Sequence, residues 1–294
     1  MAEQDLSKNT LKTILKLQKN EVKGYLVYGN IANRIKDEEN KKVLLQIAND
    51  EKAHAEVWEK VTGISVKVSP ITVWFYSILS VILGFTFTIK FMERGEFSDN
   101  KAYLNISKEF PQAKQIALDE EKHERELMSL LDEERLHYVG SMVLGLNDAL
   151  VELTGTLAGL TFALGNNKLV ALSGLITGVS ATLSMASSEY LSAKSEGKSD
   201  ALKSCTYTGI AYVLTVTFLI LPYLILPSES AFPALVIMLL IALLIIFGFN
   251  IYISIAQGLN FKARFGEMAL ISMGVAAISF VIGLIVKYFL GVEI

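Results

Sequence analysis

Cysteine is almost absent from the chain, which has only Cys205 among its 294 residues. An intramolecular disulfide needs two cysteines and a thiolate metal cluster needs several, so the sequence excludes both within this chain. The net charge of −3 and the lack of a basic stripe argue against a nucleic-acid partner. The N-terminus has no apolar segment, and we therefore expect no cleaved signal peptide.

Charged residues are scarce in the second part of the chain. Of the 27 Lys and Arg and 30 Asp and Glu residues, 57 in all, 42 lie within residues 1–138 and only 15 in the remaining 156. The apolar stretches there are long enough to cross a lipid bilayer. We predict an all-α protein, with a polar domain over 1–137 and a membrane domain over 138–294. The expected spans are 139–164, 169–192, 206–226, 231–256 and 267–290.

The short loops between these spans predict how the protein is oriented. Lys194, Lys198 and Lys203 follow the second span, and Lys262 and Arg264 follow the fourth, whereas the other two loops contain one cation between them. Cytoplasmic loops carry an excess of Lys and Arg. We therefore expect a protein of the cell membrane whose N-terminal domain is cytoplasmic and whose C-terminus is outside.

Four residues within the spans are candidates for an ion path. Asp148 and Glu152 lie one helical turn apart on the first span, and Glu189 follows Met185 by four residues late in the second. A carboxylate at membrane depth normally faces a bundle interior or an aqueous path. The alternative is that Asp148 and Glu189 lie near the cytoplasmic ends of their helices and are simply solvated. On the first interpretation the acids alternate between protonated and metal-bound states, and the Met185 thioether favours a transition metal over magnesium or calcium.

The region 139–290 resembles the vacuolar iron transporter family, most clearly in "NDALVELTGTLAGL" and "SMASSEYLSAKSE". The resemblance implies a five-helix homodimer that exchanges Fe²⁺ for protons, with Asp148, Glu152 and Met185 near the path. The chain departs from the family pattern at Thr177, where plant-type members carry a glutamate. It also has a short loop after the second span, where those members have a long acidic helical insert.

The polar domain shows helical periodicity over 7–36 and 37–62. Ser69 and Pro70 are typical of the start of a third helix, and Pro111 marks the start of a fourth that runs to about residue 135. Four long helices with short connections predict an antiparallel four-helix bundle.

Residues 71–91 form a long apolar stretch in which the only charged residue is Lys90. By length and composition this stretch could pass for a membrane span. A span there would place the acids of the first two helices and those of the last two on opposite sides of the membrane. We therefore expect 71–91 to form an apolar third helix of the bundle. Its outer face would pack against a second subunit or touch the bilayer.

Two Glu-x-x-His pairs predict a metal site in this bundle. Glu51 precedes His54 and Glu120 precedes His123, and the two pairs are 69 residues apart at both positions. Positions i and i+3 share a helix face, so each pair directs an oxygen and a nitrogen to one point. Further acids lie upstream of each pair, and glutamates from the other two helices would complete a carboxylate dimetal site. The predicted ligands are Glu21, Glu51, His54, Glu93, Glu96, Glu120 and His123.

This ligand set suits iron or manganese better than structural zinc, because it offers oxygen and nitrogen without thiolate. With it, residues 7–135 resemble the rubrerythrin branch of the ferritin-like superfamily, and the second acid, Glu96, favours that branch over ordinary ferritin. The resemblance implies a di-iron centre that binds ferrous iron and reacts with oxygen or peroxide. The cysteine-ligated module of true rubrerythrins is absent from the sequence.

These features together predict a membrane transporter that exports Fe²⁺ from the cytoplasm, with a di-iron domain that captures, oxidises or senses iron. Two alternatives stay open: a membrane-anchored di-iron oxidase or peroxidase, and a manganese exporter. No catalytic residue is assigned apart from the metal ligands. A homodimer is expected from glycines spaced by four residues in the first two spans, from the apolar third helix and from the family resemblance.

Overall fold

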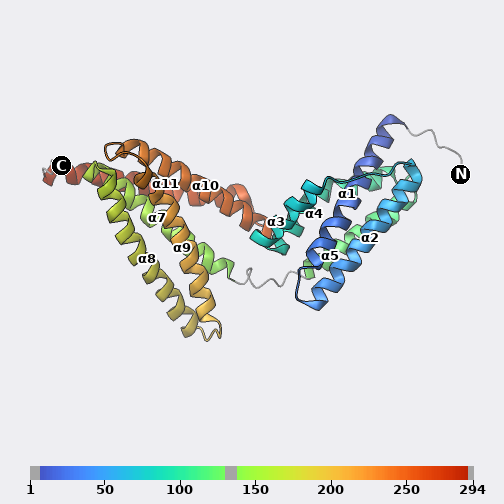
Figure 1. Ribbon diagram of the computed structural model, residues 1–294, viewed down its shortest axis with the longest axis horizontal. Helices are drawn as coiled ribbons and strands as arrows, with labels where there is room; N and C mark the ends of the chain where they lie inside the picture. Colours follow the sequence, from blue (N-terminus) through green and yellow to red (C-terminus); the bar gives the residue numbers. More distant parts are fainter. Residues whose placement is uncertain (1–6, 130–137, 291–294) are drawn as a thin grey trace. The chain divides into compact units, whose positions relative to one another are not determined.

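A computed structural model describes residues 7–129 and 138–290, and for residues 95–101, 128–129 and 290 it describes the backbone alone. Within these ranges all regular secondary structure is helical, as the sequence predicts. The chain divides into two compact units, Met1–Glu133 and Glu134–Ile294, and each is described by itself (Figure 1).

The described residues of unit 1 form five helices, and the first three begin at side chains typical of a helix start. Ser7, Asp37 and Ser69 precede α1, α2 and α3, and each side chain accepts a hydrogen bond from a backbone N–H of the first turn. Gly63 ends α2 in the left-handed conformation at φ 67°. The helices are α1 (Lys8–Ala32), α2 (Glu38–Thr62), α3 (Pro70–Leu83), α4 (Phe85–Ile106) and α5 (Gln112–Ser129).

The expected single third helix is wrong, because Gly84 divides it into α3 and α4. Gly84 has φ 93° and ψ 157°, a backbone conformation open to glycine and unfavourable for other residues. α3 is 14 residues long and α4 is 22. At about 1.5 Å per residue, α3 extends for only ~21 Å, which is shorter than the ~30 Å hydrocarbon core of a bilayer. α3 by itself is therefore too short to cross the bilayer.

Four helices of unit 1 pack in a ring around a polar layer. α1 contacts α2 and α4, and α5 contacts the same two helices, while α3 packs against α1 and α4. One apolar cluster includes Tyr28, Ile47 and Met92, and the other includes Trp58 and Ile116. The predicted ligands of α1, α2 and α5 lie between these clusters along their helices. The layer is therefore enclosed by apolar packing at both ends.

Over its described residues, 138–290, unit 2 has five helices long and apolar enough to cross a membrane, which agrees with the predicted number of spans. α7 lies at the centre of the unit, because it contacts each of the other four. The core of unit 2 is built mainly of Leu, Ile, Ala and Val side chains with Tyr212 and Tyr223. The helices are α7 (Val139–Leu164), α8 (Asn167–Ser195), α9 (Ala201–Ile225), α10 (Ala231–Ala256) and α11 (Phe261–Leu290).

The glycines spaced by four residues in α7 and α8 permit close packing within unit 2. A Cβ added at Gly159 would lie 3.1 Å from a backbone oxygen of α11, and one added at Gly178 would lie 2.5 Å from Val216 of α9. A Cβ added at Gly155 would lie 2.9 Å from Val275 of α11, and one added at Gly174 would lie 2.7 Å from Leu157 of α7. Since these faces are already filled, the glycine spacing no longer supports a homodimer.

Candidate metal centres

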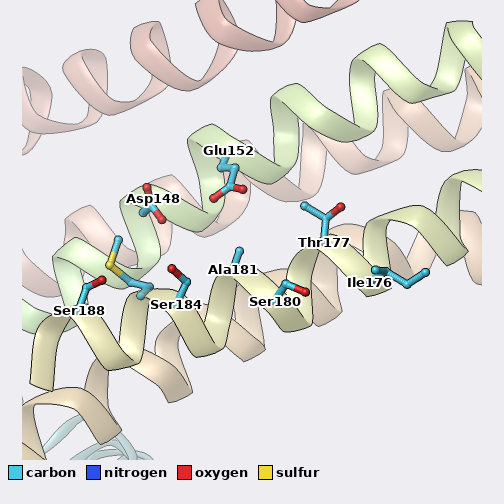
Figure 2. Close-up of a pocket in the computed structure, with 9 residues that line it drawn as sticks. Asp148, Glu152, Ile176, Thr177, Ser180, Ala181, Ser184 and Ser188 are labelled. Carbon is cyan, nitrogen blue, oxygen red and sulfur yellow. The ribbon is translucent and has the colours of Figure 1, made fainter.

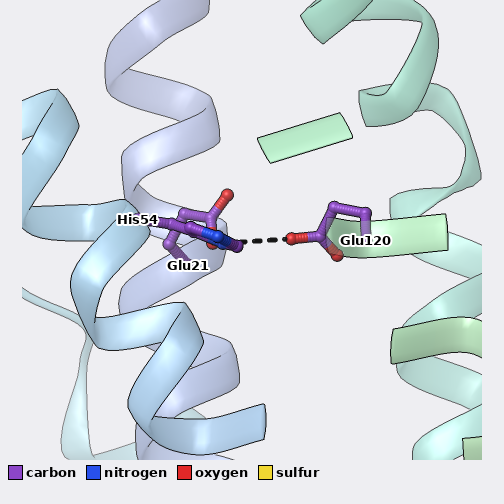
Figure 3. Close-up of side chains that lie close together, drawn as sticks. All are labelled: Glu21, His54 and Glu120. Atoms are coloured by element: carbon purple, nitrogen blue, oxygen red, sulfur yellow. Dashed lines mark ion pairs between the residues drawn. The ribbon is translucent and has the colours of Figure 1, made fainter. Parts of the chain in front are cut away.

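Unit 1 brings five of the seven predicted ligands together, from three helices. The first group contains Glu21 of α1, His54 of α2 and Glu120 of α5, whose ligand atoms lie within 4.8 Å of one another. His54 Nδ1 is 3.3 Å from Glu21 Oε2 and 3.4 Å from Glu120 Oε1. Figure 3 shows the imidazole next to the Glu21 carboxylate and facing that of Glu120.

The second group uses the other Glu-x-x-His pair. Glu51, Glu120 and His123 also offer ligand atoms within 4.8 Å of one another. His123 Nδ1 lies 3.7 Å from Glu51 Oε1, and the two imidazole rings are 5.9 Å apart. Glu120 belongs to both groups, so its carboxylate would contribute to either group if a metal were bound.

The atoms facing this space suit a metal ion. Glu21 Oε2, His54 Nδ1, Glu120 Oε1 and His123 Nδ1 are buried and make no hydrogen bond of normal geometry among the described residues, although the ion pairs within the two groups bring them to 3.3–3.7 Å of an opposite partner. A buried polar atom that lacks a good hydrogen bond costs roughly 1–3 kcal/mol, so a ligand that these atoms share would stabilise the site. Carboxylate oxygens and imidazole nitrogens without thiolate are donors that iron and manganese accept. The site therefore fits the metal pair expected from the sequence.

Two aspartates that the sequence interpretation missed orient the histidines. The Asp119 carboxylate lies 3.4 Å from His54 Nε2, and the Asp50 carboxylate lies 3.3 Å from His123 Nε2. A proton held on Nε2 leaves the Nδ1 lone pair for a metal, and such partners tune many metal-bound histidines. Asp50 and Asp119 are also separated by 69 residues, so the repeated motif is Asp-Glu-x-x-His. Extending the repeat by one residue would have found them.

Two buried tyrosines hold the glutamates in place. Tyr103 donates its hydroxyl hydrogen to Glu21 Oε1, and Tyr28 donates to Glu93 Oε1 over 2.6 Å. Burial, followed by the charge of Glu21, raises the pKa of Tyr103 well above its usual value, so this hydroxyl remains a donor. In Glu21 one oxygen is thus fixed by Tyr103 while the other faces the candidate site.

The metal-free site binds protons tightly. Burial lowers the pKa of His54, but the carboxylates of Glu120 and Glu21 raise it more, to about 10. Burial raises the pKa of Glu93 to about 7 although its bond from Tyr28 acts against this. Burial also raises the pKa of Glu120, partly offset by His54. A metal ion must displace these protons when it binds. When no metal is bound, the proton at His54 neutralises part of the negative charge of the carboxylates.

The structure tells less about the two acids predicted on the third helix, Glu93 and Glu96. Glu93 lies on α4 and belongs to neither group, but the negative charge of Glu120 contributes to its raised pKa. Glu96 follows on the same helix, and its side chain lies outside the described residues. The exposed Glu121 pairs with Arg125 on the surface of α5, away from the ligand groups.

Unit 2 has a cavity of about 520 Å³ between α7 and α8 (Figure 2). Three of the four predicted path residues line it: Asp148, Glu152 and Met185. Asp148 and Glu152 point from α7 toward the facing side of α8. Thr177 lines the same cavity, at the position where the plant-type pattern has a glutamate. The cavity thus offers two carboxylates, a thioether and several hydroxyl groups.

The hydroxyl groups form a row that the sequence interpretation overlooked. Ser180, Ser184 and Ser188 recur every four residues along α8, and all three line the cavity. Their spacing in "SATLSMASS" is the signal that could have found them. Hydroxyl oxygens can replace part of the hydration shell of a cation in a membrane path.

Glu189 lies outside this cavity lining. Its Oε1 accepts a hydrogen bond of 2.7 Å from the Ser141 hydroxyl of α7, which is also 3.0 Å from the Ser204 hydroxyl of α9. Ser141 of α7 therefore links Glu189 of α8 and Ser204 of α9. In contrast, Glu152 is exposed at the surface of the single chain, and its Oε2 accepts a hydrogen bond of 2.9 Å from the Tyr212 hydroxyl.

The comparisons with known proteins concern unit 2. The model of the VIT (vacuolar iron transporter) family matches residues 139–201, which cover α7, α8 and the first residue of α9. No curated protein matches the chain. The matched stretch contains Asp148, Glu152, Met185 and Glu189. Together with five helices of spanning length, the match indicates a multi-pass membrane protein that transports metal ions.

Proposed function

We propose that the protein exports Fe²⁺ from the cytoplasm across the cell membrane in exchange for protons, and that unit 1 is a ferritin-like di-iron domain that supplies or senses the iron. The observation that carries the transport proposal is the cavity of unit 2. It combines Asp148, Glu152 and Met185 within the stretch matched by the VIT family. Carboxylates in a membrane core are energetically costly, so two of them are not expected in a cavity that serves only a structural role.

The carboxylates explain how metal movement is coupled to protons. A carboxylate must lose its proton to bind a cation, so metal binding at Asp148 or Glu152 releases protons and protonation releases the metal. Tyr212 fixes one oxygen of Glu152 and leaves the other for the ion. The Met185 sulfur prefers soft transition ions to magnesium or calcium. Fe³⁺ is a poor cargo for such a site, and unit 1 is therefore proposed to store or deliver Fe²⁺.

The exposed Glu152 supports a homodimer. An ionised side chain on a spanning helix is rarely left facing lipid, because its desolvation costs several kcal/mol. A second subunit placed over α7 and α8 would cover Glu152 and close the cavity. Co-reconstitution of tagged and untagged chains, followed by crosslinking at α8, tests this arrangement, and a protein that remains monomeric in the bilayer contradicts it.

Unit 1 would hold the metal pair through Glu21, Glu51, His54, Glu120 and His123, with Glu93 from α4. When bound, such a pair supplies redox chemistry with oxygen or peroxide. The protein residues enclose the site between two apolar clusters, orient the imidazoles through Asp50 and Asp119, and hold a proton at His54 when no metal is bound. A manganese pair is the alternative occupant, and zinc fits the donors less well.

The second candidate function, a membrane-anchored di-iron oxidase or peroxidase, rests on the same buried metal groups. The two functions predict opposite results in proteoliposomes. For a transporter, Glu51→Ala leaves residual Fe²⁺ flux while a cavity variant such as Met185→Ala reduces it. For an anchored enzyme, Glu51→Ala abolishes iron-dependent oxygen consumption and no Fe²⁺ flux is found with the intact protein. Flux of Mn²⁺ in place of Fe²⁺ would indicate the manganese exporter.

A further inference from the structure

α3 presents its large apolar side chains outward from unit 1. Ile71 is 74% exposed, Trp74 65% and Ile82 65%. At about 100° per residue, the exposed large apolar positions of α3 occupy one continuous arc of ~120°. Soluble proteins rarely expose a contiguous apolar patch of this kind to water. The arc, called here the α3 face, consists of Ile71, Trp74, Phe75, Ile78, Val81 and Ile82.

The orientation of this face is fixed by polar contacts on the other side of the helix. The hydroxyl group of Ser77, which is buried, donates a 3.0 Å hydrogen bond to Asn30 Oδ1 of α1. The Arg34 guanidinium donates a 3.2 Å hydrogen bond to the Ser77 carbonyl. α3 therefore turns Ser77 and Tyr76 toward its own unit, while its most exposed apolar side chains face away from that unit.

We propose that the α3 face docks in the plane of the lipid bilayer surface, with its apolar side chains among the upper acyl chains. The chain itself supplies the bilayer, because unit 1 is covalently joined to the five candidate spans of unit 2. This linkage keeps lipid at a high effective concentration. α3 contains no charged residue, and its length of ~21 Å is too short to span the membrane.

The composition of the α3 face favours lipid over a second copy of the chain. Its arc of ~120° is broader than the narrow seam by which two helices pair in a coiled coil. Trp74 combines a large apolar ring with an N–H donor, as do the tryptophans enriched at membrane interfaces. The exposed Lys67 precedes the helix by three residues and offers a cation to anionic headgroups.

The two tryptophans of the chain provide a direct test. Trp58 is 0% exposed within unit 1, whereas Trp74 belongs to the α3 face. The full-length Trp58→Phe protein is reconstituted into vesicles of phosphatidylcholine brominated near the headgroup. An interfacial helix lies about 5–10 Å deep, so the bromine atoms should quench Trp74 fluorescence at least about two-fold. In the matched Trp74→Phe protein, Trp58 should keep its intensity.

A second pair of variants tests whether the α3 face causes the docking. In the Trp58→Phe background, Ile78→Glu should abolish the quenching by brominated lipid, and Leu45→Glu, at an exposed apolar position of α2, should leave it unchanged. Quenching of Trp74 by aqueous iodide instead of brominated lipid would overturn the proposal. Protection from both quenchers would also overturn it, because a protein surface would then cover α3. None of these fluorescence results depends on whether the protein transports metal, so the docking proposal and the proposed function are tested separately.

Discussion

Gly24 provides a way to displace one candidate ligand without removing any. A Cβ added at Gly24 of α1 would lie 2.7 Å from Glu51 Oε2 and 2.9 Å from its Cδ. Ordinary van der Waals contact begins at 3.4 Å, so the carboxylate must move by about 0.7 Å. Metal sites require their ligands to be held within about 0.5 Å of the productive geometry. Gly24→Ala is therefore expected to weaken metal binding.

The expected effect is large enough to measure. Displacing a ligand by this distance should lower metal affinity about tenfold, which corresponds to about 1.4 kcal/mol. Alanine stabilises a helix interior by about 1 kcal/mol relative to glycine, and the Glu51 side chain can move, so the metal-free protein should not be destabilised. Gly29→Ala is the matched control, since a Cβ there meets no described atom within 4 Å.

Anaerobic calorimetric titration of Fe²⁺ and Mn²⁺ into the detergent-solubilised protein measures the affinity, and thermal unfolding of the metal-free protein measures stability. We expect Gly24→Ala to lose affinity while Gly29→Ala keeps it. If Gly24→Ala binds both metals like the unaltered protein, the assignment of Glu51 as a ligand is refuted. If Gly29→Ala loses affinity equally, the effect arises from α1 itself and the reasoning also fails.

Three further predictions concern other contacts. Asp119→Asn, which weakens the orientation of His54, should lower metal affinity about 10- to 100-fold in the same titration, and an unchanged affinity would count against the proposed role. Because His54 has a raised pKa of about 10, metal binding must expel its proton, so affinity should rise about tenfold per pH unit below that value. Titrations in buffers of different ionisation enthalpy measure the released proton, and affinity independent of pH would contradict this. In unit 2, Gly283→Ala places a Cβ 2.5 Å from the backbone oxygen of Gly159 and should cost about 1–3 kcal/mol, seen as a lower melting temperature, whereas Gly274→Ala should not.

The pH dependence of the metal-free unit follows from the same groups. The folded-state pKa of His54 is raised from 6.5 to about 10, so its contribution to stability is fully present below pH 6.5 and is lost as the pH rises through 10. Glu93 has its pKa raised from 4.5 to about 7, so the folded state binds its proton more tightly and stability falls as the pH rises between these values. The metal-free protein should therefore melt at lower temperature in alkaline buffer, as circular dichroism would measure.

Helical periodicity and hydropathy were sufficient to predict most of the helices. The five spans agree with the helices of unit 2 to within six residues at either end, because a length of about 20 apolar residues is a strong signal. The break at Gly84 was missed, since an isolated glycine in an apolar run is equally compatible with a continuous helix. Only the backbone conformation at Gly84 reveals that α3 and α4 are separate.

The candidate sites were predicted in part, and the gaps have physical reasons. Spacing of i and i+3 placed each Glu-x-x-His pair on one face, but it could not tell that Asp50 and Asp119 contact the histidine of the opposite pair. Likewise Tyr103 and Glu21 meet across 82 positions of sequence, a contact that only the packing of helices creates. Glu189 was predicted to lie on the ion path because of its position in a span. In the structure its carboxylate accepts a hydrogen bond from the Ser141 hydroxyl and lies outside the cavity lining.

The effect of Asp148 on Fe²⁺ flux is the most direct test of the proposed transport function. The full-length protein is reconstituted into vesicles that contain a metal-sensitive and a pH-sensitive dye, and an opposing proton gradient is applied. We predict Fe²⁺ movement coupled to protons moving the other way, lowered at least about tenfold by Asp148→Asn, which keeps the shape of the side chain but removes its charge. Transport by Asp148→Asn at the rate of the unaltered protein would contradict a metal path through the cavity between α7 and α8.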